Sequence, residues 1–466
     1  MKSLHVRILS PSFLLWLLFS LGITTGFAQP HIQGKVKIDQ ENGTIRCNFT
    51  LEQVPNLADY GVLLHKGMNV KFFRDSEGQL LPYRGYYNGE IVGSASSYVF
   101  KGEDKDTLEI PSTFSVEYVG AYPIYTDSLN TFDLAEHIAW NKQTLRMSAQ
   151  SAWYPVIYDR KRGKAIDQYT YDISVELSST STIFINGTPP VKARTHQFRS
   201  TSAHPLLVFI GAYDFWSNDG NYLLNIALEG DQGQQIGQVM DTVKHVLSNI
   251  LDQKFDGKVF LINHQPISAD EGVWAFNSYP TLAFSGIDFG YVVEAYGGLP
   301  APIYKLFGHE FSHNYFGLNV FSGPLAYFWS ESISEYLSYR VAEQLFGVEY
   351  LGSEIIAVAD GLRDADGFPP LADVKDYSEI SDTYKYQLGP LVWRCFEDQF
   401  GKEKVDAILK DLMQISYDQT LTLDIWKESA LQAGISAQAF DTFYLTYLAS
   451  PTFKDQVIED MLKRYK

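Results

Sequence analysis

Short apolar runs separated by turn residues fill the first half of the chain. Residues 45–51 and 114–119 are rich in β-branched and aromatic side chains, and residues 169–177 alternate between apolar and polar positions. Turn sequences such as Asp75-Ser76-Glu77-Gly78 separate these runs. Many short strands at regular spacing are typical of all-β architectures. The pattern therefore predicts a β-sandwich or a saddle-shaped sheet from residue 30 to about residue 229.

The apolar pattern changes to a helical period in the second half. Residues 234–251 place apolar side chains three and four positions apart, at Ile236, Val239, Met240, Val243, Val246, Leu247 and Ile250. A short strand is expected at 258–262, and further helices at 401–415, 424–433 and 437–448. We place a domain boundary just before the first helix, with a β domain over 29–229 and a mainly α-helical domain over 230–466. The expected fold class is α+β with more than one domain.

Residues 1–28 have the pattern of a secretory signal. Lys2 and Arg7 precede an apolar stretch at 13–23, and Gly26-Phe27-Ala28 fits a small-x-small cleavage site. The apolar stretch is short for a membrane span. We therefore expect cleavage before Gln29 and a secreted or periplasmic protein with no membrane span after cleavage. An uncleaved anchor is the alternative.

Composition narrows the class of partner. The formal net charge of −18 argues against nucleic acid and against an anionic membrane surface. A hydrophobic content of 45% is enough for a real core. Cys47 and Cys395 lie far apart in the sequence, so two buried thiols are expected rather than a disulfide scaffold.

The strongest chemical signal is the sequence His309-Glu310-Phe311-Ser312-His313. On a helix, positions four apart share a face, so both imidazoles can bind one ion and Glu310 can act beside it as a base. Residues 303–316 contain no Pro and a single Gly, at position 308, so a helix is expected here, and Gly317 fits its end. A single H-E-x-x-H also arises by chance on a half-buried helix.

Catalytic zinc requires a third protein ligand and one open position. Glu331 and Glu335 follow in a second helical stretch at 329–336, four positions apart and on one face. Either carboxylate can turn toward the metal, while the second can orient a ligand from outside. The spacing alone leaves this choice open.

The residues around the motif resemble a known family. His309-Glu310-Phe311-Ser312-His313-Asn314-Tyr315-Phe316-Gly317 is similar to the signature of the alanyl aminopeptidase family of gluzincin peptidases, and the glycyl aminopeptidase family is also similar. The stretch at 329–336 looks like that family's L-N-E-G-F-A-x-Y. The resemblance implies a thermolysin-like catalytic domain with one zinc ion per chain, held by His309, His313 and Glu331. The 17 residues between His313 and Glu331 are one fewer than usual, and Pro324 lies in this connection.

The resemblance also assigns the acid–base and oxyanion roles. Glu310 takes the proton of the attacking water and delivers it to the leaving amine. The family places a tyrosine in a Y-x-x-G context after the glutamate ligand, where it stabilises the oxyanion. Tyr386 stands three positions before Gly389 and fits this role, with Tyr384 as the second candidate.

The expected amine-binding motif is altered. Family aminopeptidases carry a glutamate that binds the substrate α-amino group, on a strand before the zinc helix. Aligning Gly272 and Ser278 with that motif puts Trp274 where the glutamate should be. Glu271 or Asp270 can substitute from a neighbouring position, and we take Glu271 and Trp274 as substrate-binding candidates.

The sequence thus predicts a secreted zinc metallopeptidase that acts on peptides or proteins and resembles an aminopeptidase. Two alternatives remain open. An aromatic wall at Trp274 also suits an endopeptidase. A non-catalytic binding or scaffold protein that keeps the fold is the second alternative, although such a protein has no need of Glu310.

Overall fold

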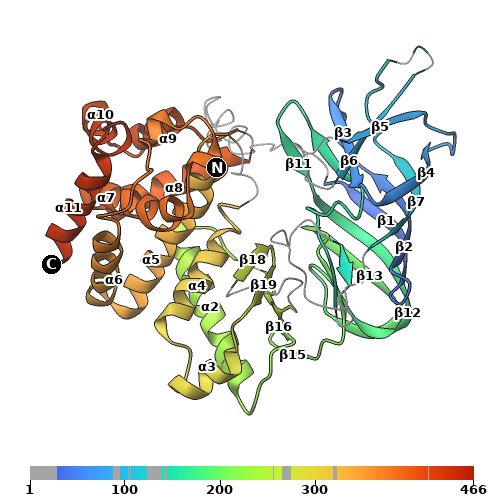
Figure 1. Ribbon diagram of the computed structural model, residues 1–466, viewed down its shortest axis with the longest axis horizontal. Coiled ribbons are helices and arrows are strands. Elements are labelled where there is room, and N and C mark those ends of the chain that lie inside the picture. The colour runs from blue at the N-terminus through green and yellow to red at the C-terminus, as the bar shows by residue number, and fades with distance from the viewer. Residues whose placement is uncertain are drawn as a thin grey trace, which may run out of the picture.

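The computed structural model describes residues 29–87, 95–102, 104, 106–122, 138–140, 144–255, 257–264, 274–317, 323–417 and 419–466. The predicted signal at 1–28 and the candidates Asp270 and Glu271 lie outside these ranges. Figure 1 shows a β half, coloured blue to green, beside a helical half, coloured yellow-green to red. The expected order of a β domain followed by a helical domain is confirmed.

Two sheets form the described part of the β half. The larger has the order β4-β7-β2-β1-β12-β14-β9-β8, with β13 also paired to β12, and the smaller has the order β11-β10-β3-β6-β5. The strands of the larger sheet are β1 (His31–Asp39), β2 (Thr44–Glu52), β4 (Met68–Asp75), β7 (Phe114–Ala121), β8 (Ala139–Trp140), β9 (Thr144–Met147), β12 (Gln168–Ile185), β13 (Val191–Pro205) and β14 (Val208–Gly211). Those of the smaller sheet are β3 (Tyr60–His65), β5 (Tyr83–Tyr87), β6 (Ala95–Phe100), β10 (Val156–Asp159) and β11 (Lys164–Ile166).

The alternation in the sequence sets which face of β12 is buried. Its apolar positions from Tyr169 to Leu177 are buried, and the polar positions between them are partly exposed. Trp153 lies fully inside the same core and donates a hydrogen bond from Nε1 to the Leu206 carbonyl at 2.8 Å. A buried indole N–H requires such a partner, so this bond fixes the chain between the two sheets.

A third sheet belongs to the second half and has the order β15-β16-β17-β19-β18. Its strands are β15 (Phe215–Asn218), β16 (Asn221–Leu224), β17 (Phe260–Asn263), β18 (Trp274–Ser278) and β19 (Thr281–Ser285). β15 and β16 precede the boundary that we placed at residue 230. β15 pairs with β16, and β16 pairs with β17, which follows the helix at 232–251. The third sheet therefore begins before that boundary.

Helices build the rest of the second half. They are α2 (Gln232–Leu251), α3 (Phe289–Tyr296), α4 (Ala301–Ser312), α5 (Ile333–Phe346), α6 (Val348–Gly361), α7 (Gly389–Phe400), α8 (Lys402–Ser416), α9 (Leu423–Gln432), α10 (Ala437–Phe443) and α11 (Phe453–Tyr465). In the described part of this half, three π-helical turns adjoin these helices, at η2 (Phe328–Ser332), η5 (Tyr384–Leu388) and η6 (Tyr444–Leu448). The predicted helices at 234–251, 401–415 and 424–433 are confirmed within two residues at each end.

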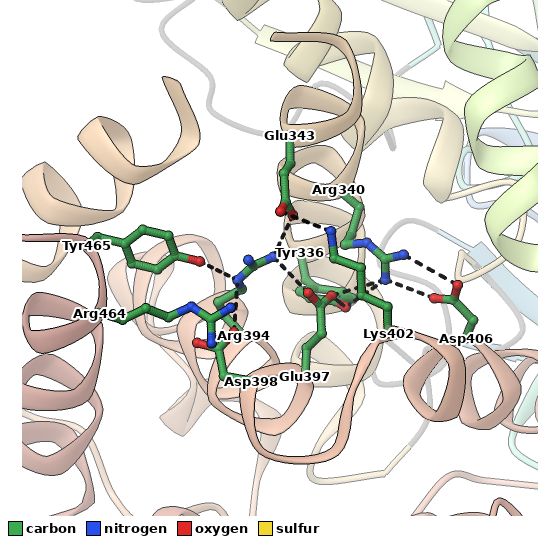
Figure 2. A network of polar contacts seen from close by, with 10 residues as sticks. All are labelled: Tyr336, Arg340, Glu343, Arg394, Glu397, Asp398, Lys402, Asp406, Arg464 and Tyr465. Carbon is green, nitrogen blue, oxygen red and sulfur yellow. Dashed lines mark hydrogen bonds and ion pairs between the residues drawn. The ribbon is translucent and has the colours of Figure 1, made fainter. Parts of the chain in front are cut away.

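A network of charges, buried at its centre, joins α5 to α7, α8 and α11 (Figure 2). Arg394 is fully buried and pairs with Glu343 at 2.8 Å and with Glu397 at 2.9 Å. Arg340 reaches Glu397 at 3.1 Å and Asp406 at 2.8 Å. The remaining members are Tyr336, Asp398, Lys402, Arg464 and Tyr465. Removing one partner of a buried ion pair is strongly destabilising, so these pairs hold α5 and α7 in one register.

Both cysteines are buried free thiols, Cys47 in β2 and Cys395 in α7, as expected. Among the described residues, no helix is both long and apolar enough to cross a membrane.

The two halves meet at buried polar contacts next to β18. The Asn186 side chain donates to the Tyr279 carbonyl at 2.8 Å and accepts from the Thr281 hydroxyl at 2.6 Å. His204 lies beside this contact, with its ring 5.8 Å from that of Tyr279, and is 6% exposed. Burial lowers the pKa of His204 from 6.5 to about 4, against a weaker opposing effect of a backbone hydrogen bond at Tyr279.

This pKa predicts a pH-dependent part of the stability. Below pH 6.5 the unfolded chain takes up a proton at residue 204, whereas the folded chain does so only near pH 4. The folded state therefore loses up to about 3 kcal/mol relative to a His204→Gln variant as the pH falls from 7.5 to 4. Urea unfolding of both proteins in chelator, so that metal binding does not contribute, measures this difference. Parallel pH curves would contradict the buried, neutral state of His204.

Candidate metal centre

Helix α4 carries His309 in its last turn, and His313 is the residue that caps its C-terminal end. Phe307 and Phe311 bury its inner face, and Gly308 allows close packing on α5, because a Cβ there would lie 3.2 Å from the Ser338 Cα. The helix ends at Ser312, four residues before the predicted end at Phe316. The chain turns after His313 and buries Tyr315 and Phe316 in the core, which ends the helix before Gly317.

Glu331 reaches the histidines from the π-helical turn η2, directly before α5. Trp329 and Phe328 anchor this turn in an aromatic cluster, where both rings contact Trp393 and Trp426. π-Helical turns are rare and occur frequently at functional sites. The tightly packed turn therefore holds the Glu331 carboxylate toward α4.

The three candidate ligand atoms have the spacing of a zinc site. The Nε2 atoms of His309 and His313 are 3.2 Å apart, and each lies 3.5 Å from Glu331 Oε2. Donors at about 2.0–2.1 Å from a tetrahedral zinc ion are about 3.3 Å from one another. Within the described parts of the chain, these residues form the one group of histidine, cysteine and carboxylate side chains spaced to hold a metal. The donors present therefore fit zinc.

Hydrogen bonds on the side away from the candidate metal position orient both imidazoles. His309 Nδ1 donates to Glu335 Oε2 at 2.9 Å, and His313 Nδ1 lies 3.2 Å from the Ser334 hydroxyl. These contacts leave both Nε2 atoms directed at the candidate metal position. Lys305 lies 3.6 Å from Glu335 and 2.8 Å from Glu354, so the charge of Glu335 is itself balanced. The structure thus places Glu331 toward both Nε2 atoms and Glu335 behind His309.

The charges of the cluster stabilise one another. Burial alone would raise the pKa of Glu331, but its hydrogen bonds to both imidazoles hold that pKa far below the usual range. Burial would lower the pKa of His309, and the hydrogen bonds to Glu331 and Glu335 outweigh it and raise the pKa to about 10. Without metal, His309 is therefore protonated, and a metal ion bound at its Nε2 would replace that proton.

Glu310 faces the same cavity from α4 and is 7% exposed. Burial raises the pKa of its carboxyl group, partly offset by the two neighbouring imidazoles. Its backbone carbonyl accepts a hydrogen bond from the Asn277 side chain at 2.6 Å, which ties α4 to β18. A buried carboxylate with a raised pKa is suited to accept and return a proton.

Tyr386 and Tyr384 have different surroundings. Tyr386 lines the cavity, its ring lies 5.8 Å from that of His309, and its hydroxyl is hydrogen-bonded to Glu331. Burial and the Glu331 carboxylate raise the pKa of Tyr386, so the hydroxyl keeps its proton and can donate it in a hydrogen bond. Tyr384 is fully buried and donates to the Pro369 carbonyl at 3.0 Å. The geometry therefore favours Tyr386 for the oxyanion role.

A cavity of about 310 Å³ opens above these residues. Gln150 and Gln168 reach it from the β half, and residues 275–278 of β18 form another wall. The described acidic residues that line it are Glu310 and Glu331. Trp274 begins β18, whereas Glu271 lies outside the described residues.

Sequence reasoning missed four contributors: Asn277, Ser334, Gln150 and Gln168. Ser334 is three positions after Glu331, on the same helical face, so the spacing of η2 and α5 carried a signal. The two glutamines come from a separate domain and had no local signal.

Solved structures identify the fold around this site. A variant of the M1 zinc metallopeptidase from Deinococcus radiodurans, with a bound Tyr-Ser-Ala substrate, matches with a TM-score of 0.60 and 14% identity, over 89% of this chain and 92% of that chain. Leukotriene A4 hydrolase from Saccharomyces cerevisiae matches with a TM-score of 0.56 and 13% identity, over 92% of this chain and 69% of that chain. The sequence itself matches no family model and no curated protein. The chain therefore has a fold similar to that of these M1 zinc metallopeptidases, as the motif resemblance implied.

The hydrogen bond from His309 to Glu335 predicts that Glu335 strengthens zinc binding. Glu335→Gln keeps the size of the side chain but removes the charge behind His309, so we expect zinc affinity to fall about tenfold or more. Glu354→Gln serves as the matched control, because it removes the other carboxylate of Lys305 without touching an imidazole. Competition with a chromophoric chelator at pH 7 measures both. Equal affinities for wild type and Glu335→Gln would contradict this role.

Proposed function

We propose that this chain is a secreted zinc-dependent peptidase with aminopeptidase-like action. The observation that carries the proposal is the metal-ligand spacing of His309, His313 and Glu331, with the Glu310 carboxylate in the same cavity. The fold supports it, since one structural neighbour was solved with a peptide substrate. A pure binding protein would gain nothing from a buried glutamate such as Glu310, whose charged form is disfavoured by burial.

In the proposed reaction, the metal site, Glu310 and Tyr386 have separate roles. A zinc ion bound at this site supplies a Lewis acid that polarises the scissile carbonyl and acidifies water. Glu310 accepts the proton of the attacking water and passes it to the departing amine, which its raised pKa favours. The Tyr386 hydroxyl donates a hydrogen bond to the oxygen on which negative charge develops.

The cavity walls suit an extended peptide. β18 is the last strand of the described sheet and borders the cavity along residues 275–278. An extended chain can add to such an edge through backbone hydrogen bonds. The amide groups of Gln150 and Gln168 on the opposite wall can bond a peptide backbone without requiring a charge.

Glu271 is the proposed contact of the substrate amine. It precedes Trp274, the first residue of β18, by three positions in the sequence, so it leads into the strand that forms the cavity wall. Trp274 takes the place of the usual glutamate and is proposed to close the substrate site on that side. Export is proposed on the basis of the signal pattern at 1–28.

Glu310→Gln tests the reaction itself. We expect kcat on peptide substrates to fall by about 10²–10⁴ with zinc still bound at one ion per chain, because the amide cannot accept the proton of water. Peptide cleavage followed by mass spectrometry, together with metal analysis, measures both quantities. Wild-type protein that binds zinc, captures peptides and cuts none, with or without chelator, would replace this proposal by the non-catalytic binding protein.

Matched peptides test the aminopeptidase-like action. A peptide with a free N-terminus is expected to lose single N-terminal residues, with kcat/KM at least about tenfold above its N-acetylated counterpart, since a charge-assisted hydrogen bond would stabilise the bound amine. Glu271→Gln should remove that difference and leave the acetylated peptide unaffected. Internal cuts, with no preference for the free amine, would establish an endopeptidase instead.

A further inference from the structure

Two π-helical turns carry Glu331 and Tyr386, the two site residues that come last in the sequence. η2 holds Glu331 and continues without a break into α5, and η5 holds Tyr386 and continues in the same way into α7. Each turn therefore positions one polar group at the start of a long helix. The separation of the two groups depends on how η2 and η5 meet.

The two turns meet at one buried hydrogen bond. The Ser332 hydroxyl, next to Glu331, donates to the carbonyl of Lys385, next to Tyr386, at 2.9 Å. Ser332 is fully buried. Because the bonded residues are the immediate neighbours of Glu331 and Tyr386, this bond couples the two turns at the level of the site.

Gly389 makes this contact possible. A Cβ at position 389 would lie 2.0 Å from the Ser332 Oγ and 2.6 Å from its Cβ, well inside the van der Waals distance. The next nearest atom, the Tyr384 carbonyl oxygen, would lie at 3.2 Å and needs only a small adjustment. The steric constraint on residue 389 therefore comes almost entirely from Ser332. The motif that this stretch resembles has glycine at the position of Ser332, so the hydroxyl is a feature of this chain.

The far ends of the same helices are also fixed. Arg340 of α5 pairs with Glu397 of α7 at 3.1 Å, and Arg394 of α7 pairs with Glu343 of α5 at 2.8 Å (Figure 2). Because these ion pairs fix the register of the two helices, the remaining movement of η2 relative to η5 is limited by the Ser332–Lys385 hydrogen bond.

We propose that Ser332 and Gly389 are positioning residues that set the distance between the Tyr386 hydroxyl and the Glu331 carboxylate. The inference rests on the proposed function, because the placement of Tyr386 matters for a developing oxyanion. Ser332 and Gly389 themselves touch neither substrate nor metal. Their effect passes through the backbone of η2 and η5.

Three variants separate positioning from simple stability. Ser332→Ala removes the hydrogen bond and adds no atoms, Gly389→Ala introduces the steric overlap, and the double variant Ser332→Gly/Gly389→Ala removes the overlap again. A misplacement of a catalytic group by about 1 Å costs up to about 10² in rate. We therefore expect kcat to fall about tenfold in Ser332→Ala and about 10² in Gly389→Ala, and the double variant to regain about tenfold over Gly389→Ala.

The binding measurements must stay unchanged if the role is positioning. Zinc affinity and KM should remain within about twofold of wild type, while affinity for a peptide phosphonate, which mimics the tetrahedral oxyanion, should fall in parallel with kcat. Ser416→Ala, which removes another fully buried hydroxyl that bonds within its own helix, should leave kcat unchanged. A kcat in Ser332→Ala equal to wild type, or a double variant no better than Gly389→Ala, would overturn the proposal.

A structural measurement keeps this test independent of activity. Crystal structures of metal-free wild type and Gly389→Ala should differ in the distance from the Tyr386 hydroxyl to the Glu331 carboxylate, and the double variant should restore it. Unchanged distances overturn the positioning role even where peptide cleavage is observed. Absence of cleavage in wild type would count against the proposed function alone, since the distances can still be compared.

Discussion

The second half of this protein is organised around the contact of one carboxylate with two imidazoles. Glu331 lies 3.5 Å from the Nε2 atoms of both His309 and His313, and all three side chains are mostly buried. Groups of this kind lose hydration on burial, so each needs a partner at short range. These partners follow one another in space away from the cavity. Glu335 lies behind His309, and Lys305 lies next to both Glu335 and Glu354. The charge is thus balanced in steps from the cavity toward the surface.

Such a cluster requires a rigid frame, and the aromatic core provides it. Trp329 and Phe328 of η2 pack on Trp393 and Trp426, whose rings stack at 4.4 Å. Behind them the Arg340–Glu397 and Arg394–Glu343 pairs join α5 to α7. Because α5 and α7 continue from the turns that carry Glu331 and Tyr386, rigidity at the core determines geometry at the site. Apolar packing resists displacement of the helices, and the ion pairs specify which register they adopt.

The sequence predicted the parts of this arrangement that depend on local spacing. His309 and His313 share a helical face whatever surrounds them, so the motif located the site directly. Glu331 and Glu335 also share a face, and spacing alone left their roles open; the structure places one toward both Nε2 atoms and the other behind one ring. The choice between Tyr384 and Tyr386 was harder, because a π-helical turn shifts the phase of a helix and its periodicity no longer indicates which side chain faces the cavity. Gln150 and Gln168 depend on the packing of two domains, which no local pattern contains.

That packing explains why the β half belongs to the site and is more than an attached module. Asn186, fully buried in the β half, bonds to Tyr279, in the turn between β18 and β19, and to Thr281, the first residue of β19. β18 in turn is tied to α4 by the hydrogen bond from the Asn277 side chain to the Glu310 carbonyl. These hydrogen bonds, joined by the backbone of β18, connect the β half to the backbone of Glu310. In the proposed reaction, the strand that would receive a peptide also fixes the backbone of Glu310, so substrate placement and proton transfer would share one structural element.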